Sequence, residues 1–326
     1  MAIVPFGTKG MRKSIFHEDW WLDAVAPGQW QQVTCERGGR LAGHLRFVEY
    51  FASGMRACQM PQLTRVLGPV VLSAAGKVES RVRFVHSVVT ELVSRLADFE
   101  NVEMTLDPSF TDLTPFLESG CEVSVLQTFL LDCSRPSDEL WTGMRDKTRN
   151  VVRRARERLM VKDIDDADLF VSFYRSNLDG EKCYFNLGLV RGLFEAAHVR
   201  GQGKIAAAID SSGMVHAKVF FVWDDQRLYY FLSTRDRKVA DVGDDRALRR
   251  LEGCLLLERA GQVVAHRGAV EALGGVELVG VADDVGQALE HLGEVRLRLL
   301  VGAGSHQVLD QLDAAAGRAR AQELLD

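Results

Sequence analysis

The sequence predicts an α/β protein with mixed sheets, and three observations support this class. Stretches with the apolar repeat of a helix alternate with stretches that have the period-two pattern of a strand. The 326 residues are enough for two ordinary domains with separate cores. Two stretches, VTCERGGRLAGHLRFV and AAAIDSSGMVHAKVFFV, repeat one order of short strand, acidic residue, glycine turn and alternating strand. This internal echo indicates duplicated halves.

The first half of the chain alternates helices and strands as one α/β layer domain does. The stretch HEDWWLDAVA, residues 17–26, predicts a short helix. Strands at 33–36 and 41–48 flank the turn Arg-Gly-Gly-Arg and predict a hairpin. A loop with two prolines, 60–69, either lines a pocket or acts as a rigid connector. The remaining elements are a helix at 78–96, a strand at 102–106, a short helix at 112–118 and a strand at 123–131.

The second half opens on a strongly basic stretch, residues 134–159, SRPSDELWTGMRDKTRNVVRRARERL. Pro136, Ser137 and the two acids that follow them predict a helix start. One apolar stripe consists of Leu140, Met144, Thr148, Val151, Val152, Ala155 and Leu159. At about 100° per residue, the cations flank that stripe, with Arg145, Arg149, Arg153 and Arg156 on one side and Lys147, Arg154 and Arg158 on the other.

Two interpretations of these cations compete. In one, they are long side chains at the rim of a core helix, whose methylene groups cover apolar surface. In the other, one guanidinium row meets a phosphate-bearing ligand, because the planar fork of arginine matches phosphate oxygens. The pattern alone does not choose between them.

Further elements follow the basic helix in the order helix, helix, strand, strand, strand. The helices are predicted at 167–178 and 187–199, and the strands at 204–210, 214–223 and 227–233. The turns between the strands, Ser-Ser-Gly and Asp-Asp-Gln, are hairpin signals of ordinary strength.

Composition excludes several classes of protein. No run of about 18 apolar residues exists, so we expect no membrane span, and the N-terminus lacks the apolar core of a signal peptide, so we expect a cytoplasmic protein. The net charge of -5 and the pI of about 6.0 disfavour a broad nucleic-acid surface and DNA binding. The six cysteines form no CxxC pair, so we expect no metal site and no disulfide framework.

The stretch LWTGMRDKTRNVVRRARERLMV resembles the helix that joins the two halves of FemAB-like acyltransferases. These are the two-domain branch of the GNAT (Gcn5-related N-acetyltransferase) fold, often described in bacteria as BioF2-like acetyltransferases. Three further stretches agree: WWLDAVAPGQWQQVTCERGGRLAGHLRFV, MPQLTRVLGP and VHAKVFFVWDDQRLYYFLS. They resemble the family's first helix and hairpin, its proline-bearing loop and its central hairpin. Together the matches cover roughly residues 20–235, in the right order.

The resemblance implies a tandem GNAT-like fold and the transfer of an acyl or aminoacyl group to an amine. The implied parts are a first GNAT-like domain at 1–135, a second at 136–240 that begins with the basic helix, and a divergent C-terminal part at 241–326. On this basis the second half is expected to be either complete or missing its last strands.

The implied donor site uses the backbone of a splayed central strand and the N-terminus of the following helix, where a pyrophosphate binds well. The strand is 227–233, which makes Tyr229, Ser233 and Gly243 the candidates for binding coenzyme A. The usual signature of single-domain members, Q/RxxGxG/A, is missing here. Asp244 beside Gly243 also places negative charge near the proposed pyrophosphate, which is electrostatically unfavourable.

Acyl transfer to an amine also needs a group that removes the amine proton. By chain position the candidates are His216, Asp224 and Tyr230. A lone histidine on an alternating strand is more often packed or solvated than catalytic, and Asp224 is also explained as a turn former. Tyr229 and Tyr230 point to opposite faces of one strand, so one is expected in the core while the other lines a cleft.

For acceptor binding we favour Arg149 and Arg153, with Lys147 behind them. The expected acceptor is an amine on a sugar nucleotide, a polysaccharide precursor or a cell-wall precursor. The expected donor is acyl-CoA. Aminoacyl-tRNA is the alternative, disfavoured because the chain lacks the paired-helix arm of some tRNA-using members and is acidic overall.

Two other classes of function stay open. One is a noncatalytic or degenerate GNAT-like protein that binds a phosphorylated ligand or a partner. The other is nucleic-acid binding through the cations at 145–158, which would weaken steeply with salt.

Composition changes abruptly after Arg235. All 5 Trp, 5 Tyr and 16 Phe residues lie at or before Phe231, and the rest of the chain is dominated by small, aliphatic and charged residues. A folded second half normally brings aromatic core residues. The stretch GGVELVGVADDVGQALEHLGEVRLRLLVGAG supplies no strand of the family's type. Two explanations remain: a divergent tail, or a tail translated in a shifted reading frame.

Overall fold

The computed structural model describes residues 13–52, 54–72, 76–108, 110, 112–132, 136–178, 180, 182–236, 277–280 and 290–300. The chain divides into two compact units. The first comprises Met1–Leu126, Tyr184–Asn186 and Gly293–Asp326, and the second comprises Gln127–Cys183 and Leu187–Leu292. Each unit packs helices against a mixed sheet, which confirms the predicted α/β class.

The sheet of the first unit begins with the predicted hairpin. Its strands, in order across the sheet, are β1 (Trp30–Arg37), β2 (Arg40–Ala52), β3 (Met55–Gln59), β5 (Asn101–Leu106) and β12 (Glu290–Leu300). The pairing of β3 with β5 is parallel, and the other three pairings are antiparallel. The two-residue strand β4 (Val70–Val71) pairs with β2.

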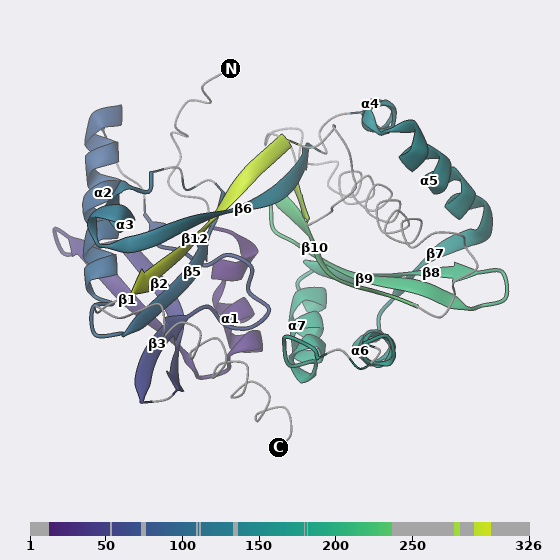
Figure 1. Ribbon diagram of the computed structural model, residues 1–326, viewed down its shortest axis with the longest axis horizontal. Coiled ribbons are helices and arrows are strands. Elements are labelled where there is room, and N and C mark those ends of the chain that lie inside the picture. The colour runs from purple at the N-terminus through teal and green to yellow at the C-terminus, as the bar shows by residue number, and fades with distance from the viewer. Residues whose placement is uncertain are drawn as a thin grey trace. The chain divides into compact units, whose positions relative to one another are not determined.

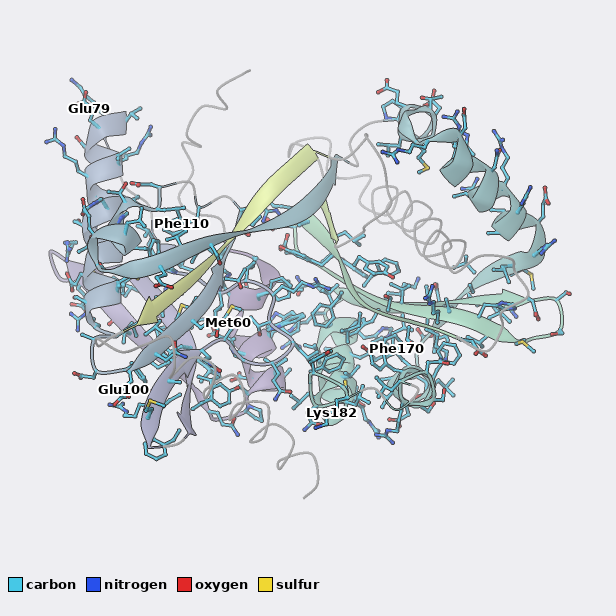
Figure 2. All side chains as sticks on the ribbon, in the orientation of Figure 1. Met60, Glu79, Glu100, Phe110, Phe170 and Lys182 are labelled. Carbon is cyan, nitrogen blue, oxygen red and sulfur yellow. The ribbon has the colours of Figure 1, made fainter. Side chains whose placement is uncertain are left out.

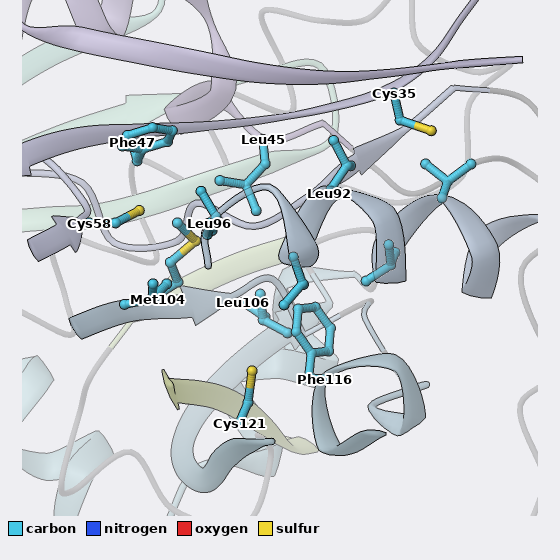
Figure 3. Packing of buried hydrophobic residues seen from close by; sticks show 14 of the residues in the cluster. Cys35, Leu45, Phe47, Cys58, Leu92, Leu96, Met104, Leu106, Phe116 and Cys121 are labelled. Carbon is cyan, nitrogen blue, oxygen red and sulfur yellow. The ribbon is translucent and has the colours of Figure 1, made fainter. Parts of the chain in front are cut away.

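The core of the first unit lies between this sheet and two helices, α2 (Val78–Ser94) and α3 (Thr114–Glu118). Leu45 of β2, Leu92 of α2 and Phe116 of α3 belong to one cluster of buried side chains, which Figure 3 shows. The predicted helix at 78–96 therefore packs through its apolar face. The opposite face of β2 meets the short helices η1 (Ile15–His17) and α1 (Asp19–Val25).

The sheet of the second unit contains the predicted second hairpin. Its strands, in order, are β6 (Cys121–Asp132), β11 (Glu277–Gly280), β10 (Arg227–Arg235), β9 (Val215–Trp223), β8 (Gly203–Asp210) and β7 (Leu159–Ile164). β6 begins in the first unit and ends in the second. The antiparallel pairs β1–β2 and β8–β9 are the two hairpins of the internal echo, so both halves of the echo form the element it predicts.

Helices α6 (Ala167–Ser176) and α7 (Gly188–Val199) cover one face of this sheet (Figure 1). Phe220 of β9 is fully buried there, and its ring centroid lies 6.3 Å from that of Phe170 and 5.6 Å from that of Phe194. Phe170 is labelled in Figure 2, between the sheet and α6. Gly203 of β8 allows α7 to approach, because a Cβ atom at this position would lie only 2.5 Å from the Cβ of Ala197.

The basic stretch forms two helices instead of the single predicted one. α4 spans Ser137–Gly143 and α5 spans Asp146–Arg158, and the backbone between them is extended at Met144 and Arg145. The apolar stripe is nevertheless correct where side chains are described, since Leu140, Met144, Val152 and Ala155 are buried. The prediction also ran one element into the next, because Leu159 begins strand β7.

The C-terminal stretch that lacked a family-type strand contributes two strands. β11 pairs with β10 and with β6, and β12 pairs with β5. The expectation concerned only a strand of the family's type and named neither of these two strands. The period-two order Val-Arg-Leu-Arg-Leu at 295–299 is itself a strand pattern.

Candidate functional site

The central strand of the second unit, β10, pairs with a strand on each side. It pairs antiparallel with β9 from Leu228 to Arg235, and its described parallel pairing with β11 covers Arg227–Tyr229. The β9 register also shifts between Tyr230 and Leu232. The described pairing of β10 with β11 therefore covers the start of β10, and the splayed central strand stays a prediction because the residues that directly follow Gly280 lie outside the described part.

The two tyrosines of β10 point to opposite faces, as predicted. Tyr229 stands opposite Val222, and Tyr230 stands opposite Phe221, with 6.1 Å between the ring centroids of Tyr230 and Phe221. Both tyrosines are buried in the described structure. Ser233 lies farther along β10, opposite Val219, and is partly exposed.

His216 forms a pair that the sequence did not predict. Its Nε2 lies 2.9 Å from Oδ2 of Asp210, across the turn between β8 and β9. This bond, together with bonds from the hydroxyl of Ser212 and from backbone N–H groups, holds the pKa of Asp210 well below its usual value. The histidine is only 5% exposed.

Asp224, the second candidate base, is a turn residue. Its Oδ1 accepts the backbone N–H groups of Gln226 and Arg227 at 2.9 and 2.8 Å. Its Oδ2 lies 3.4 Å from the hydroxyl of Tyr229. Both carboxylate oxygens thus bind within the β9–β10 hairpin, which favours the turn interpretation over a role as base.

Arg149 holds the corner between α4 and α5. Its Nη1 donates to the carbonyl oxygens of Thr142 and Met144, both at 2.8 Å, and its Nη2 pairs with Asp146. The carbonyl groups at the end of α4 lack partners within the helix, and the guanidinium supplies one. This geometry gives Arg149 a structural role, and ligand binding by this residue stays a prediction.

Arg153 belongs to a cationic group around Trp141 of α4. The guanidinium carbons of Arg153 and Arg156 lie 5.7 and 5.4 Å from the Trp141 ring centroid, within the range of a cation–π contact. Arg153 also donates to Oδ1 of Asn150 at 3.0 Å. Both arginines are exposed. The structure therefore puts an aromatic ring and two cations together on this corner.

Two predicted residues lie outside the described part. Lys147 belongs to the first turn of α5, but its side chain is not among those described. Gly243 lies outside the described residues altogether.

Sequence reasoning missed Asp210 and Trp141 as members of these groups, whereas it had placed Arg156 in one row with Arg153. The sequence did contain a signal for Asp210. Asp-Ser-Ser-Gly is a turn sequence, and His216 lies on the alternating strand that follows this turn. Trp141 carried no such signal. Its meeting with Arg153 and Arg156 depends on the break between α4 and α5, which the single predicted helix did not include.

A separate group of buried polar side chains lies in the first unit. His17 accepts a bond at Nε2 from the backbone N–H of Gly68 at 3.4 Å, and its Nδ1 lies 2.9 Å from Oγ of Ser14. His44 is 7% exposed, and its Nε2 has no hydrogen-bond partner among the described residues. Burial lowers the pKa of both imidazoles to about 4, with Arg46 contributing to each.

Nowhere in the described ranges do three His, Cys, Asp or Glu side chains gather closely enough to hold a metal ion. None of the helices in those ranges combines the length and the apolar character that crossing a bilayer requires. Cys35, Cys58 and Cys121 are buried and unpaired, whereas Cys133 and Cys254 lie outside the described residues.

Each of the two units has the mixed α/β fold that the sequence predicted. No protein-family model matches the chain, and no curated protein matches it. Solved structures do match, although their sequences are only distantly similar.

The fold is similar to that of FemX. The crystal structure of FemX matches 96% of this chain and 98% of its own, with a TM-score of 0.62 and 10% identity. L-PGS from Bacillus licheniformis matches 89% of each chain, with a TM-score of 0.51 and 9% identity. The C-terminal domain (DUF2156) of a putative lysylphosphatidylglycerol synthetase from Agrobacterium fabrum matches 91% of each, with a TM-score of 0.52 and 12% identity.

Proposed function

We propose that this protein is an N-acyltransferase that moves an acyl group from acyl-CoA to an amine on a sugar nucleotide, polysaccharide precursor or cell-wall precursor. The observation that carries the proposal is the two-unit fold, which is similar to that of FemX and places β10 between β9 and β11 in the sheet of the second unit. The reaction is proposed to take place in the cytoplasm.

The side chains at the corner between α4 and α5 favour an acceptor that carries negative charge. Arg153 and Arg156 bring two guanidinium groups to the ring of Trp141. An aromatic face suits a sugar or base ring, and guanidinium groups suit phosphate oxygens. Among the candidates for acceptor binding, Arg153 is favoured over Arg149, because the guanidinium of Arg149 already serves the carbonyl groups of α4.

The reaction is one nucleophilic substitution at the acyl carbon. The acceptor nitrogen attacks the thioester carbonyl, the C–N bond forms, and the C–S bond breaks to release the coenzyme A thiolate. A protein base takes the proton that leaves the nitrogen. Backbone N–H groups would stabilise the charge that develops on the carbonyl oxygen.

An aminoacyl donor is the second candidate. One fold relative is named for lysylphosphatidylglycerol, a lipid that carries a lysyl group, so the fold is found in a protein named for an aminoacyl product. We keep acyl-CoA first because α5 offers only a local basic surface on an acidic protein.

The test measures thiol release from acetyl-CoA and longer acyl-CoA thioesters with amino-sugar nucleotides as acceptors. A parallel reaction uses lysyl-tRNA and follows transfer of labelled lysine. Release that depends on both donor and acceptor supports the first candidate, and transfer from lysyl-tRNA alone replaces it with the second. Ligand binding without turnover of either donor supports the noncatalytic alternative.

A matched pair of variants tests the acceptor site. Arg153→Ala removes a cation from the Trp141 ring, and we expect it to raise the acceptor KM about tenfold, equal to about 1.4 kcal/mol of binding. Arg154→Ala removes an exposed cation from the next position of α5 and serves as the control. Equal effects of the two variants would mean that general charge on α5, and not this corner, acts on the acceptor.

A further inference from the structure

His216 occupies an irregular position on β9. In the pairing of β8 with β9, Ala208 stands opposite Ala217 and Ile209 stands opposite Val215, so His216 is the extra residue of a β-bulge. A bulge re-aims the side chain that it carries, and bulges are frequent beside functional sites. The backbone carbonyl of His216 accepts the N–H of Asp236 at 2.9 Å, so the bulge lies beside the end of β10.

The carboxylate that faces His216 is fixed in place. Oδ1 of Asp210 accepts the N–H and the hydroxyl of Ser212 at 2.9 and 2.6 Å, and the N–H of Met214 at 3.0 Å. Three donors therefore occupy Oδ1. Oδ2 bonds Nε2 of His216 at 2.9 Å. Because each oxygen has its own hydrogen-bond partners, the carboxylate is held in one orientation relative to the imidazole.

This arrangement selects one tautomer of the imidazole. The bonds around Asp210 hold its pKa well below the usual value, so the group is an ionised acceptor at neutral pH. An acceptor at Oδ2 requires a proton on Nε2, which leaves Nδ1 with its lone pair. Nδ1 is buried and has no hydrogen-bond partner among the described residues. A buried acceptor without a donor is costly and is commonly completed by water or a ligand.

The neighbouring charged groups are engaged elsewhere. Lys218, two residues along β9, donates its amine to the carbonyl of Leu169 and lies 5.1 Å from the Phe173 ring centroid. Burial lowers the pKa of Lys218, and Asp166 at the start of α6 opposes that shift. Asp210 is thus the charged group that bonds the ring of His216 in the described structure.

We propose that Asp210 is a positioning residue that holds His216 with Nδ1 free to take the proton of the acceptor amine. This inference rests on the proposed acyl transfer and adds the identity and orientation of its base. The amine, or one water bound to it, donates to Nδ1. As the C–N bond forms and the C–S bond breaks, the proton moves to Nδ1, and the imidazolium is stabilised through Nε2–H by Asp210. The proton then passes to the departing thiolate.

The first test is the tautomer itself, and it does not depend on activity. Long-range ¹⁵N–¹H spectra of protein with labelled histidine distinguish Nε2–H from Nδ1–H, and His216→Gln identifies the signal. We expect the Nε2–H form in the wild type. In Asp210→Asn the amide can donate to Nε2, so we expect a shift to the Nδ1–H form. The same tautomer in both proteins would overturn the proposal.

The second test is kinetic. Asp210→Asn and His216→Gln are expected to lower kcat about 100-fold, the lower end of the usual contribution of a general base, with little change in donor KM. Ser212→Ala weakens the turn but keeps the carboxylate on His216, so it should keep both the tautomer and most of kcat. Asp112→Asn is the matched control, because Asp112 caps the N–H of Thr114 without contacting any histidine in the described structure.

The outcomes separate this proposal from the proposed function. If the wild type transfers acyl groups and Asp210→Asn keeps its kcat, the positioning role is wrong and the function stands. If Asp210→Asn and Ser212→Ala lose activity in step with lowered melting temperatures, the Asp210 carboxylate serves only the turn. If the wild type turns over no donor, both the proposed function and the catalytic role of His216 are overturned, whatever its tautomer.

Discussion

Acidification should destabilise the first unit through His17 and His44. Both imidazoles have pKa values lowered from 6.5 to about 4, mainly because burial disfavours the charged form. Above pH 6.5 both are neutral in the folded and unfolded states, so neither makes stability depend on pH. Below pH 6.5 the unfolded chain binds protons that the folded chain does not, and stability falls until about pH 4.

The size of the effect follows from the shift. Each histidine removes about 1.4 kcal/mol of unfolding free energy per pH unit below 6.5. Lowering the pH from 7.5 to 5 therefore costs about 2 kcal/mol for each histidine and about 4 kcal/mol for the two. Replacing His44, whose Nε2 lacks a partner in the described structure, with Gln should remove about half of the slope.

The assay must report the first unit separately from the second. Protein is equilibrated in urea at pH 7.5, 6 and 5, then pulse-labelled with deuterium at one fixed pH, and peptides from β2 are followed by mass spectrometry. His198→Gln, at an exposed position on α7, is the control and should leave the pH slope of β2 unchanged. A slope in His44→Gln equal to that of the wild type would refute the assignment of the effect to this buried ring.

Three further predictions concern stability. Arg149→Ala should lower the unfolding free energy of the α4–α5 corner by about 1–3 kcal/mol, because it leaves carbonyl groups of α4 without their charged donor; hydrogen exchange of α4 peptides checks this, and unchanged protection would contradict it. Gly203→Ala should cost about 1–3 kcal/mol in thermal unfolding, since the new Cβ would lie 2.5 Å from that of Ala197; Gly213→Ala controls for glycine loss, although its φ of +89° adds strain of its own. Phe220→Ala should cost about 3–5 kcal/mol by opening a cavity beneath α6 and α7, and Phe220→Leu should recover part of it.

Much of the fold was predictable because it rests on local patterns. The helix at 78–96 and the hairpin strands of the internal echo are confirmed. Their apolar residues recur every 3.6 or every 2 positions, and this spacing can be recognised within a short stretch of sequence. The break between α4 and α5 was missed, because the charged residues around Met144 suit a helix and only the extended backbone there ends one. The residue pattern alone does not reveal that the backbone at Met144 and Arg145 is extended.

The candidate site was predictable only in part. His216 was named from its place on the strand, but its pairing with Asp210 depends on the register of β8 and β9 and on one extra residue in β9. Asp224 looked equally suitable, and the structure shows its oxygens bound within its own hairpin. Register and bulges are set by long-range pairing, which a single sequence does not display.

The pairing of β12 with β5 has a consequence for synthesis on the ribosome. Val295 stands opposite Leu106, about 190 residues earlier in the chain. The edge of β5 that pairs with β12 therefore has no partner strand until most of the protein has been translated. Closing the long loop between the two strands is also slow. An exposed strand edge can pair with other chains. Nascent chains stalled before residue 290 should accordingly depend on chaperones more than the released protein does.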